Sequence, residues 1–178
     1  MYFLILIVLF LHPMLQVFPE CYSDTVLVQF LTDNPLDVVH IYGTPNVAKE
    51  LNEANKFEKS GRFIGVVDKD KRTPPYLLTF ETIIEKNKLC FKQKDNLDHY
   101  LIVIDKAIES FLLWNAAQVS VNIMDYGFPT EVKSLGRVLK TSSIGSNPDY
   151  PRLLTDLHAR NAPGFVTLHQ LLNDLVTT

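Results

Sequence analysis

Two short runs of uninterrupted apolar residues constrain the fold of this chain more than any other feature of its sequence. Residues 63–67 read FIGVV, residues 101–104 read LIVI, and an aspartate follows each run. Strands that are apolar on both faces are typical of a parallel sheet with helices on each side, whereas a strand with one face in water alternates apolar and polar residues. The two runs therefore predict interior strands of an α/β sheet.

Helical segments separate these runs from other strand-like segments. The segment that begins at Thr44-Pro45 offers a hydroxyl cap and a proline at the first helical position. Strands separated by helices of this length indicate crossover units. We predict strands over 15–18, 38–42, 63–67 and 100–104, and helices over 22–31, 44–56, about 105–116, 151–160 and 166–176. The expected fold is α/β, with a mainly parallel central sheet, helices on both faces and a helical C-terminal cap.

The composition indicates one globular domain. The chain has 178 residues, of which 47% are hydrophobic, and this is enough to bury a core. Its net charge of −3 excludes a globally basic surface, so any phosphate-binding patch must be local. Cys21 and Cys90 stand far apart with no zinc-type spacing around them, which argues against a disulfide framework and fits free thiols in the cytoplasm.

The N-terminal segment is apolar, but it matches no targeting signal well. It lacks the basic start and the small-residue cleavage site of a secretory signal. It reaches the length of about 20 residues that a membrane span needs only by including His12, Pro13 and Gln16. We expect residues 1–13 to be an apolar extension, residues 14–178 to form the domain, and no stable membrane insertion. A membrane anchor and a buried strand or helix remain as alternatives.

Carboxylates gather where two predicted strands end. Asp68 and Asp70 follow the strand 63–67, and residues two apart on an extended chain point to the same side. Glu20 follows the first strand, and Asp24 lies one helical turn further on. Ligands of open α/β sheets bind at the carboxyl ends of the strands, and Mg²⁺ prefers carboxylate oxygens. For an isolated Asp-x-Asp a solvated turn is the preferred explanation, but a cation would explain why several carboxylates are brought together.

The order of these elements resembles the Toprim domain, which occurs in topoisomerases, bacterial primases, OLD-family nucleases and small stand-alone proteins. The resemblance covers about residues 14–110, from Pro19-Glu20-Cys21-Tyr22-Ser23-Asp24 to Asp68-Lys69-Asp70, and leaves a helical part over about 111–178. It implies that Glu20 is the family's general acid/base or metal ligand, and that Asp68 and Asp70 bind Mg²⁺. Asp24 matches an acidic position that is frequent one turn into the first helix. Cys21 departs from the family, which commonly has glycine directly after the glutamate.

The resemblance implies two classes of function. The chain is too short to carry the tyrosine domain of a topoisomerase or the substrate-binding modules of a primase. It therefore resembles a stand-alone nuclease that cleaves phosphodiester bonds with Mg²⁺, or with Mn²⁺ in its place. In that interpretation Glu20 and Asp68 are catalytic, and Lys71 and Arg72 bind DNA or RNA. The alternative is a non-catalytic protein of the same fold that acts through a protein partner or as a homo-oligomer, which the acidic composition favours.

Several other residues have a structural explanation that we prefer. Trp114 lies on an amphipathic helix and is expected to pack in the core. His40 and His99 are expected to be structural histidines, although His99 could also contact phosphate. Asp105 and Glu109 are one helical turn apart and could extend the acidic site, but capping and solvent exposure account for them as well.

Overall fold

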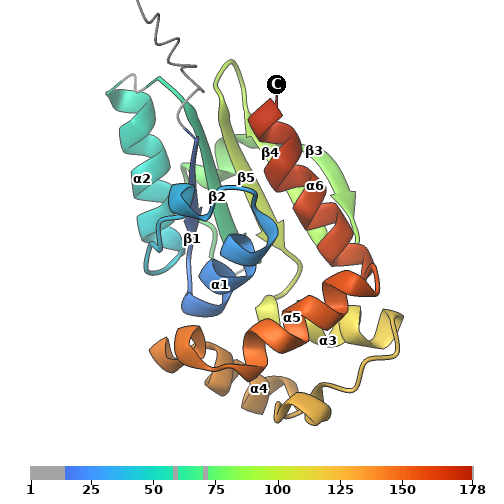
Figure 1. Ribbon diagram of the computed structural model, residues 1–178. Helices are drawn as coiled ribbons and strands as arrows, with labels where there is room; N and C mark the ends of the chain where they lie inside the picture. The colour runs from blue at the N-terminus through green and yellow to red at the C-terminus, as the bar shows by residue number, and fades with distance from the viewer. Residues whose placement is uncertain (1–14, 58–59, 70–71, 178) are drawn as a thin grey trace, which may run out of the picture.

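The computed structural model of the chain describes residues 15–57, 60–69 and 72–177. Within these ranges, five strands form one sheet in the order β1-β2-β5-β4-β3 (Figure 1). The pairs β1·β2 and β2·β5 are parallel, whereas β5·β4 and β4·β3 are antiparallel. The strands span Leu15–Pro19 (β1), Arg62–Asp68 (β2), Phe80–Lys86 (β3), Leu89–Lys94 (β4) and His99–Ile104 (β5). The α/β class is confirmed, but the sheet is mixed rather than mainly parallel.

The helices agree well with the sequence pattern in the first half of the chain. Helix α1 and helix α2 have the predicted bounds, while α3 begins three residues after the predicted start at Asp105. The α-helices of the described chain are Tyr22–Leu31 (α1), Thr44–Lys56 (α2), Ile108–Gln118 (α3), Val132–Leu139 (α4), Asp149–Ala159 (α5) and Pro163–Thr177 (α6). None of the helices in these ranges is both long and apolar enough to cross a membrane. The expectations for residues 1–13 lie outside the described residues.

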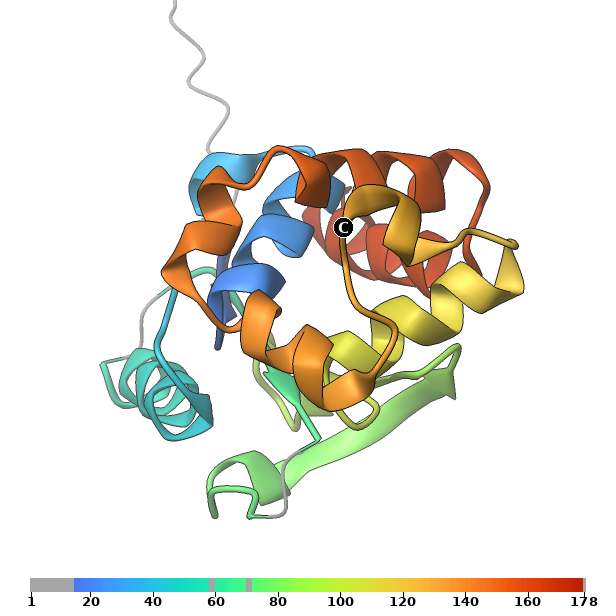
Figure 2. The same ribbon diagram turned by 90° about the horizontal axis from the view of Figure 1, so that it is seen from below.

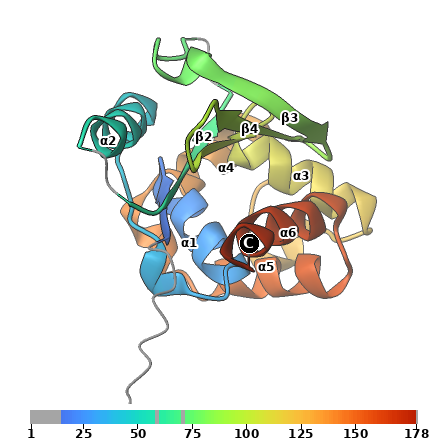
Figure 3. The ribbon, with the colours of Figure 1, turned by 90° about the horizontal axis from the view of Figure 1, so that it is seen from above.

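The two faces of the sheet are covered to different extents. Ile64 and Ile102 point into a large core shared with α1, α3, α4, α5 and α6, whereas Phe63 and Leu101 point into a smaller one shared with α2. Figures 2 and 3 show α2 on the opposite side of the sheet from the C-terminal helices. These helices are not a separate cap, because their apolar side chains belong to the same core as the strands. The prediction of helices on both faces is therefore confirmed.

The backbone of β2 approaches α2 closely, and this contact fixes the position of α2 on the sheet. A Cβ atom at Gly65 of β2 would lie 2.9 Å from Val47 Cγ1 and 3.0 Å from Leu51 Cδ1. Since real Cβ contacts are longer, only glycine lets α2 pack this closely. The chain enters α2 through Gly43, whose φ of +83° also favours glycine and whose N–H donates to the carbonyl of Glu20 at 2.9 Å. The start of α2 is thereby held next to the end of β1.

The strand predicted over 38–42 is not formed. The segment follows β1 and donates from Val39 N to Val17 O at 2.8 Å and from Ile41 N to Pro19 O at 2.9 Å, but only Val38 makes a bridge. His40 lies half-buried in this segment and shares a hydrogen bond of 2.8 Å with the hydroxyl of Thr25. Because the chain turns at Gly43 directly afterwards, the segment ends before it forms a continuous ladder of hydrogen bonds with β1.

The hairpin β3-β4 is the main element that the sequence pattern does not predict. Its turn residues Asn87 and Lys88 have φ angles of 51° and 64°, a left-handed conformation usually signalled by Asn-Gly. Strand β3 is exposed over most of its length and therefore lacks an apolar run. Asp68 pairs with Ile104, Ile104 with Leu89, and Leu89 with Lys86. The hairpin turn thus lies at the same edge of the sheet as Asp68.

Candidate metal centre

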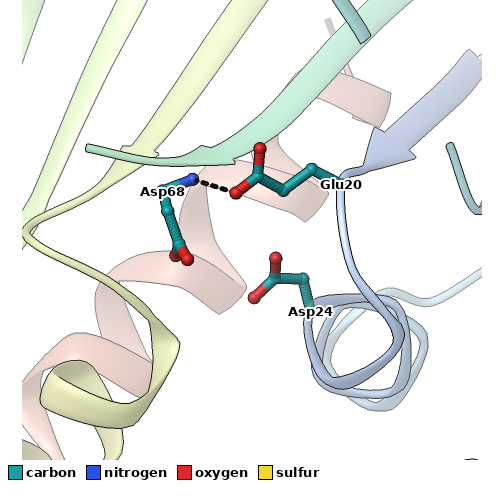
Figure 4. A group of neighbouring side chains, drawn as sticks. All are labelled: Glu20, Asp24 and Asp68. Atoms are coloured by element: carbon teal, nitrogen blue, oxygen red, sulfur yellow. Dashed lines mark hydrogen bonds between the residues drawn. The ribbon is translucent and has the colours of Figure 1, made fainter. Parts of the chain in front are cut away.

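Three of the four predicted metal ligands come together at the carboxyl ends of β1 and β2. Glu20 follows β1, Asp68 ends β2, and Asp24 projects from the first turn of α1 (Figure 4). One carboxylate oxygen from each residue lies within 4.8 Å of the other two. The pairing of Pro19 with Val66 brings these strand ends side by side, as expected for a crossover. We call Glu20, Asp24 and Asp68 the carboxylate cluster.

Glu20 is held by donors on both of its carboxylate oxygens. Oε1 accepts a hydrogen bond from the backbone N–H of Asp68 at 3.1 Å, and Oε2 accepts one from the hydroxyl of Thr44. Thr44 is buried, and its hydroxyl does not cap α2, whose N-cap is Gly43. The sequence pattern Thr44-Pro45 predicts a helix cap, and this prediction is wrong because the hydroxyl of Thr44 orients Glu20 instead.

Asp68 accepts a hydrogen bond at the start of α3. Its Oδ1 lies 3.0 Å from the backbone nitrogen of Ile108, which is the first residue of that helix. Burial raises the pKa of Asp68, and the negative charges of Asp24, Glu20 and Glu109 raise it further. The carboxylate is therefore well placed by the backbone but costly to keep ionised without a counter-charge.

Asp24 is fully buried, with one oxygen bonded and one oxygen unpartnered. Oδ2 accepts a hydrogen bond from the thiol of Cys21 at 2.9 Å, while Oδ1 has no hydrogen-bond partner among the described residues. Burial raises the pKa of Asp24, and this outweighs the hydrogen bond from Cys21, which lowers it. A buried carboxyl group of this kind is stabilised by a proton or by a cation.

Cys21 is the N-cap of α1. Its Sγ accepts from the backbone N–H of Asp24 at 3.5 Å, and burial raises the pKa of the thiol far above its ordinary value, so the thiol stays protonated. The backbone of Cys21 is extended, with φ of −137°, so the glycine expected from the Toprim resemblance is not required by the conformation here. The departure instead supplies a hydrogen-bond donor to Asp24.

Two residues outside the cluster act on it electrostatically. Glu109 of α3 raises the pKa values of Asp24 and Asp68, and its buried Oε2 has no hydrogen-bond partner in the described part of the chain. Lys140, directly after α4, lowers both pKa values. Glu109 could be predicted near the acidic site from its spacing to Asp105. Lys140 could not, because the packing of the C-terminal helices brings it there and no local sequence pattern indicates it.

A small cavity of about 290 Å³ opens on the cluster. Glu20 and Asp68 line it together with Thr44, Tyr42 and Lys140. It therefore places one cationic side chain and two of the three carboxylates around a common space. A space of this size can hold water and the oxygens of a phosphate group beside a cation.

Some predicted site residues do not join the cluster. Asp70 and Lys71 lie outside the described residues, so their predicted roles stay predictions. Arg72 is exposed and lines neither the small cavity nor a larger one beside it. Asp105 does not extend the acidic site, because it pairs with Lys69 at 3.6 Å and Lys88 at 3.2 Å.

His40 and His99 both lie outside the carboxylate cluster. His99 begins β5 and pairs with Phe63, at the edge of the sheet away from Asp68. It is buried, and burial lowers its pKa, so the phosphate contact considered for it does not arise here. The ring of His40 stacks on Tyr22 with ring centroids 4.5 Å apart.

Comparisons of the chain with protein-family models, with curated proteins and with solved structures gave no match.

Proposed function

We propose that the protein is a divalent-cation-dependent enzyme that cleaves phosphodiester bonds in nucleic acid, on a Toprim-like fold. The observation that supports this most is the carboxylate cluster itself, in which oxygens of three acidic residues lie within 4.8 Å of one another while Asp24 is fully buried. Like charges held this close repel strongly in a medium of low dielectric constant. A bound cation removes that repulsion.

The donor set suits Mg²⁺, with Mn²⁺ as an alternative ion. Hard cations take carboxylate oxygens and keep part of their water shell, and the small cavity beside Glu20 and Asp68 leaves room for that water. The unpartnered Oδ1 of Asp24 supplies a further oxygen donor. When bound, such an ion polarises a phosphate and lowers the pKa of an attacking water.

The side chains of the site have different roles in the proposed reaction. Glu20 is fixed by Thr44 and by the N–H of Asp68, so its carboxylate has a defined direction for accepting a proton from water. Asp24 and Asp68 complete the oxygen set. Lys140 lines the same small cavity and offers a positive charge to a phosphate.

One observation favours a second candidate function, a binding or regulatory protein of the same fold. The thiol of Cys21 donates to Asp24, and burial raises the pKa values of Asp24 and Asp68. A cluster that is partly protonated in this way is stable without an ion. Such a protein would bind nucleic acid or a protein partner and would not cleave.

A cleavage assay distinguishes the two candidates. End-labelled single- and double-stranded DNA and RNA are incubated with the full chain and Mg²⁺, Mn²⁺ or chelator. We expect cleavage that needs the metal, is lost in Glu20→Gln and is kept in Asp95→Asn, which removes an exposed carboxylate away from the cluster. No cleavage of any substrate under any of these conditions, or cleavage that Glu20→Gln leaves intact, would refute the enzyme proposal.

A further inference from the structure

A larger cavity opens beside the carboxylate cluster, on the face of the sheet that carries α2. Its volume is about 540 Å³, and Val67 of β2 with Leu101 and Val103 of β5 form part of its lining. On this face α2 packs on β2, and Leu77 joins the same buried cluster as Leu101, so the cavity lies between these groups and the strands β5, β4 and β3. The volume falls within the range of about 300–1,000 Å³ that is typical of small-molecule sites.

Lysines line this cavity around its apolar part. The hairpin turn brings Lys86 and Lys88 to the edge where β2 ends, while Lys92 lies further along β4 and pairs with Leu101 of β5. Lys88 is paired with Asp105, whereas Lys86 and Lys92 form no ion pair with any residue in the described ranges. The cavity lining is mixed in charge, because four lysines stand against three acids, Asp68, Glu85 and Asp105.

Trp114 also lines the cavity. It was expected in the core, but it is only half-buried, and its side chain borders the open space. A tryptophan ring with lysines nearby is a typical platform for an unpaired base. Trp114 lies off the buried stripe of α3, which consists of Ile108, Phe111, Leu112, Asn115 and Ala116, so its ring is available to a ligand in the cavity.

The cavity is continuous with the site proposed for cleavage. Asp68 and Thr44 line both the large and the small cavity. A ligand in the large cavity therefore lies directly next to the carboxylate cluster. The combination of an apolar wall, an aromatic ring and lysines matches the base and the phosphates of one nucleotide.

We propose that this cavity is a subsite for one nucleotide of a single strand, next to the phosphodiester bond at the cluster. The nucleic-acid ligand class rests on the proposed function. A base can enter a concave cavity only when it is unpaired and unstacked, so the subsite selects single strands over duplexes. Lys86 and Lys92 bind the phosphate backbone, while Val103 and Trp114 contact the base.

The single tryptophan of the chain gives a direct readout. The full chain is titrated with an oligothymidylate of about eight nucleotides, a length within the range of single-strand sites. Chelator is present at low salt, so cleavage plays no part. We expect saturable quenching of Trp114 fluorescence, and much weaker binding of a duplex of the same length.

Two variants and a control locate the binding. Lys92→Ala should weaken binding severalfold and reduce the slope of log affinity against log salt by about 0.7, the value for one lost phosphate contact on a single strand. Thr82→Phe places a ring from β3 into the cavity at an exposed strand position and should also weaken binding. Lys56→Ala removes an exposed lysine that lines neither cavity and should change nothing.

The outcomes separate this proposal from the cleavage proposal. Binding that both Lys92→Ala and Thr82→Phe weaken supports the subsite, whether or not the protein cleaves. No quenching by single strands, equal affinity for the duplex, or binding that both variants leave unchanged would overturn the subsite, even if metal-dependent cleavage is found.

Discussion

The carboxylate cluster and the larger cavity meet at Asp68 and Thr44, yet they are built in opposite ways. The cluster consists of buried or half-buried acids, each held by a specific donor from the backbone, a hydroxyl or a thiol. The larger cavity is lined by both lysines and acids of the hairpin and its surroundings, and strand β3 of that hairpin is largely exposed. Burying a charged side chain costs free energy and fixes its position, whereas an exposed lysine loses little hydration and keeps its conformational freedom. In the two proposals made above, the first region carries the chemistry and the second binds the substrate.

The largest difference between the regions should appear in catalysis. Asp68→Asn removes a charge and a ligand oxygen from the cluster, so we expect metal-dependent cleavage to fall by at least about 100-fold. The melting temperature of the metal-free protein should stay the same or rise, because like-charge repulsion is relieved and an amide oxygen can still accept from Ile108. Cleavage rates and thermal melts of the same preparations test this. A variant that cleaves as fast as the wild type would contradict the assignment.

The second difference should appear in the pH dependence of stability. Burial raises the pKa values of Asp24 and Asp68 in the folded protein above their unfolded values. Their protonated forms therefore stabilise the fold at low pH, and this contribution is lost as pH rises through the raised values. Each unit of pKa shift corresponds to about 1.4 kcal/mol, so we expect the metal-free protein to lose a few kcal/mol between about pH 5 and about pH 9.

Urea unfolding in chelator at both pH values measures this loss. Asp24→Asn carries no titrating group at its position and should flatten the curve, while Asp95→Asn should not. Unfolding free energy that rises with pH over this range would show that the two carboxyl groups are not held in a costly charged state.

A smaller effect should follow from the thiol that caps α1. Cys21→Ala removes the cap and the donor to Asp24, so we expect a loss of about 1–2 kcal/mol in the free energy of unfolding. Cys21→Ser keeps a capping oxygen and a donor and should recover most of that loss. Equal stability of the alanine variant and the wild type would mean that the Cys21 contacts contribute nothing.

The smallest effect on stability should come from the cavity. Lys86→Ala removes an exposed side chain that has no ion pair in the described chain, so the unfolding free energy should change by less than about 0.5 kcal/mol. If the cavity binds the substrate strand, KM for cleavage of single strands should rise severalfold while kcat stays the same. A fall in kcat with unchanged KM would place Lys86 in the chemistry instead of in binding.

The carboxylate cluster could be predicted from the sequence because local patterns place its three residues. Apolar runs that end in acids fixed Glu20 and Asp68 at strand ends, and the periodicity of α1 placed Asp24 on the next turn. Parallel pairing of neighbouring strands then brought these ends together. The grouping of these three carboxylates could therefore be predicted before the fold was known.

The cavity could not be predicted in the same way. Strand β3 alternates poorly, its Asn87-Lys88 turn lacks glycine, and the position of Trp114 beside the hairpin depends on contacts between distant segments. The hydroxyl of Thr44 was misassigned for a related reason, since its bond to Glu20 joins residues 24 apart in the chain. Long-range contacts of this kind leave no local signal.

Titration calorimetry of Mg²⁺ and Mn²⁺ into the full chain tests the central claim most directly. We expect one saturable site in the wild type and in Asp95→Asn, and binding at least about tenfold weaker in Asp24→Asn, which removes a buried ligand. Binding should release protons, because burial and neighbouring acids raise the pKa values of Asp24 and Asp68. No binding of either ion to the wild type, or equal binding by Asp24→Asn, would contradict a metal centre at Glu20, Asp24 and Asp68.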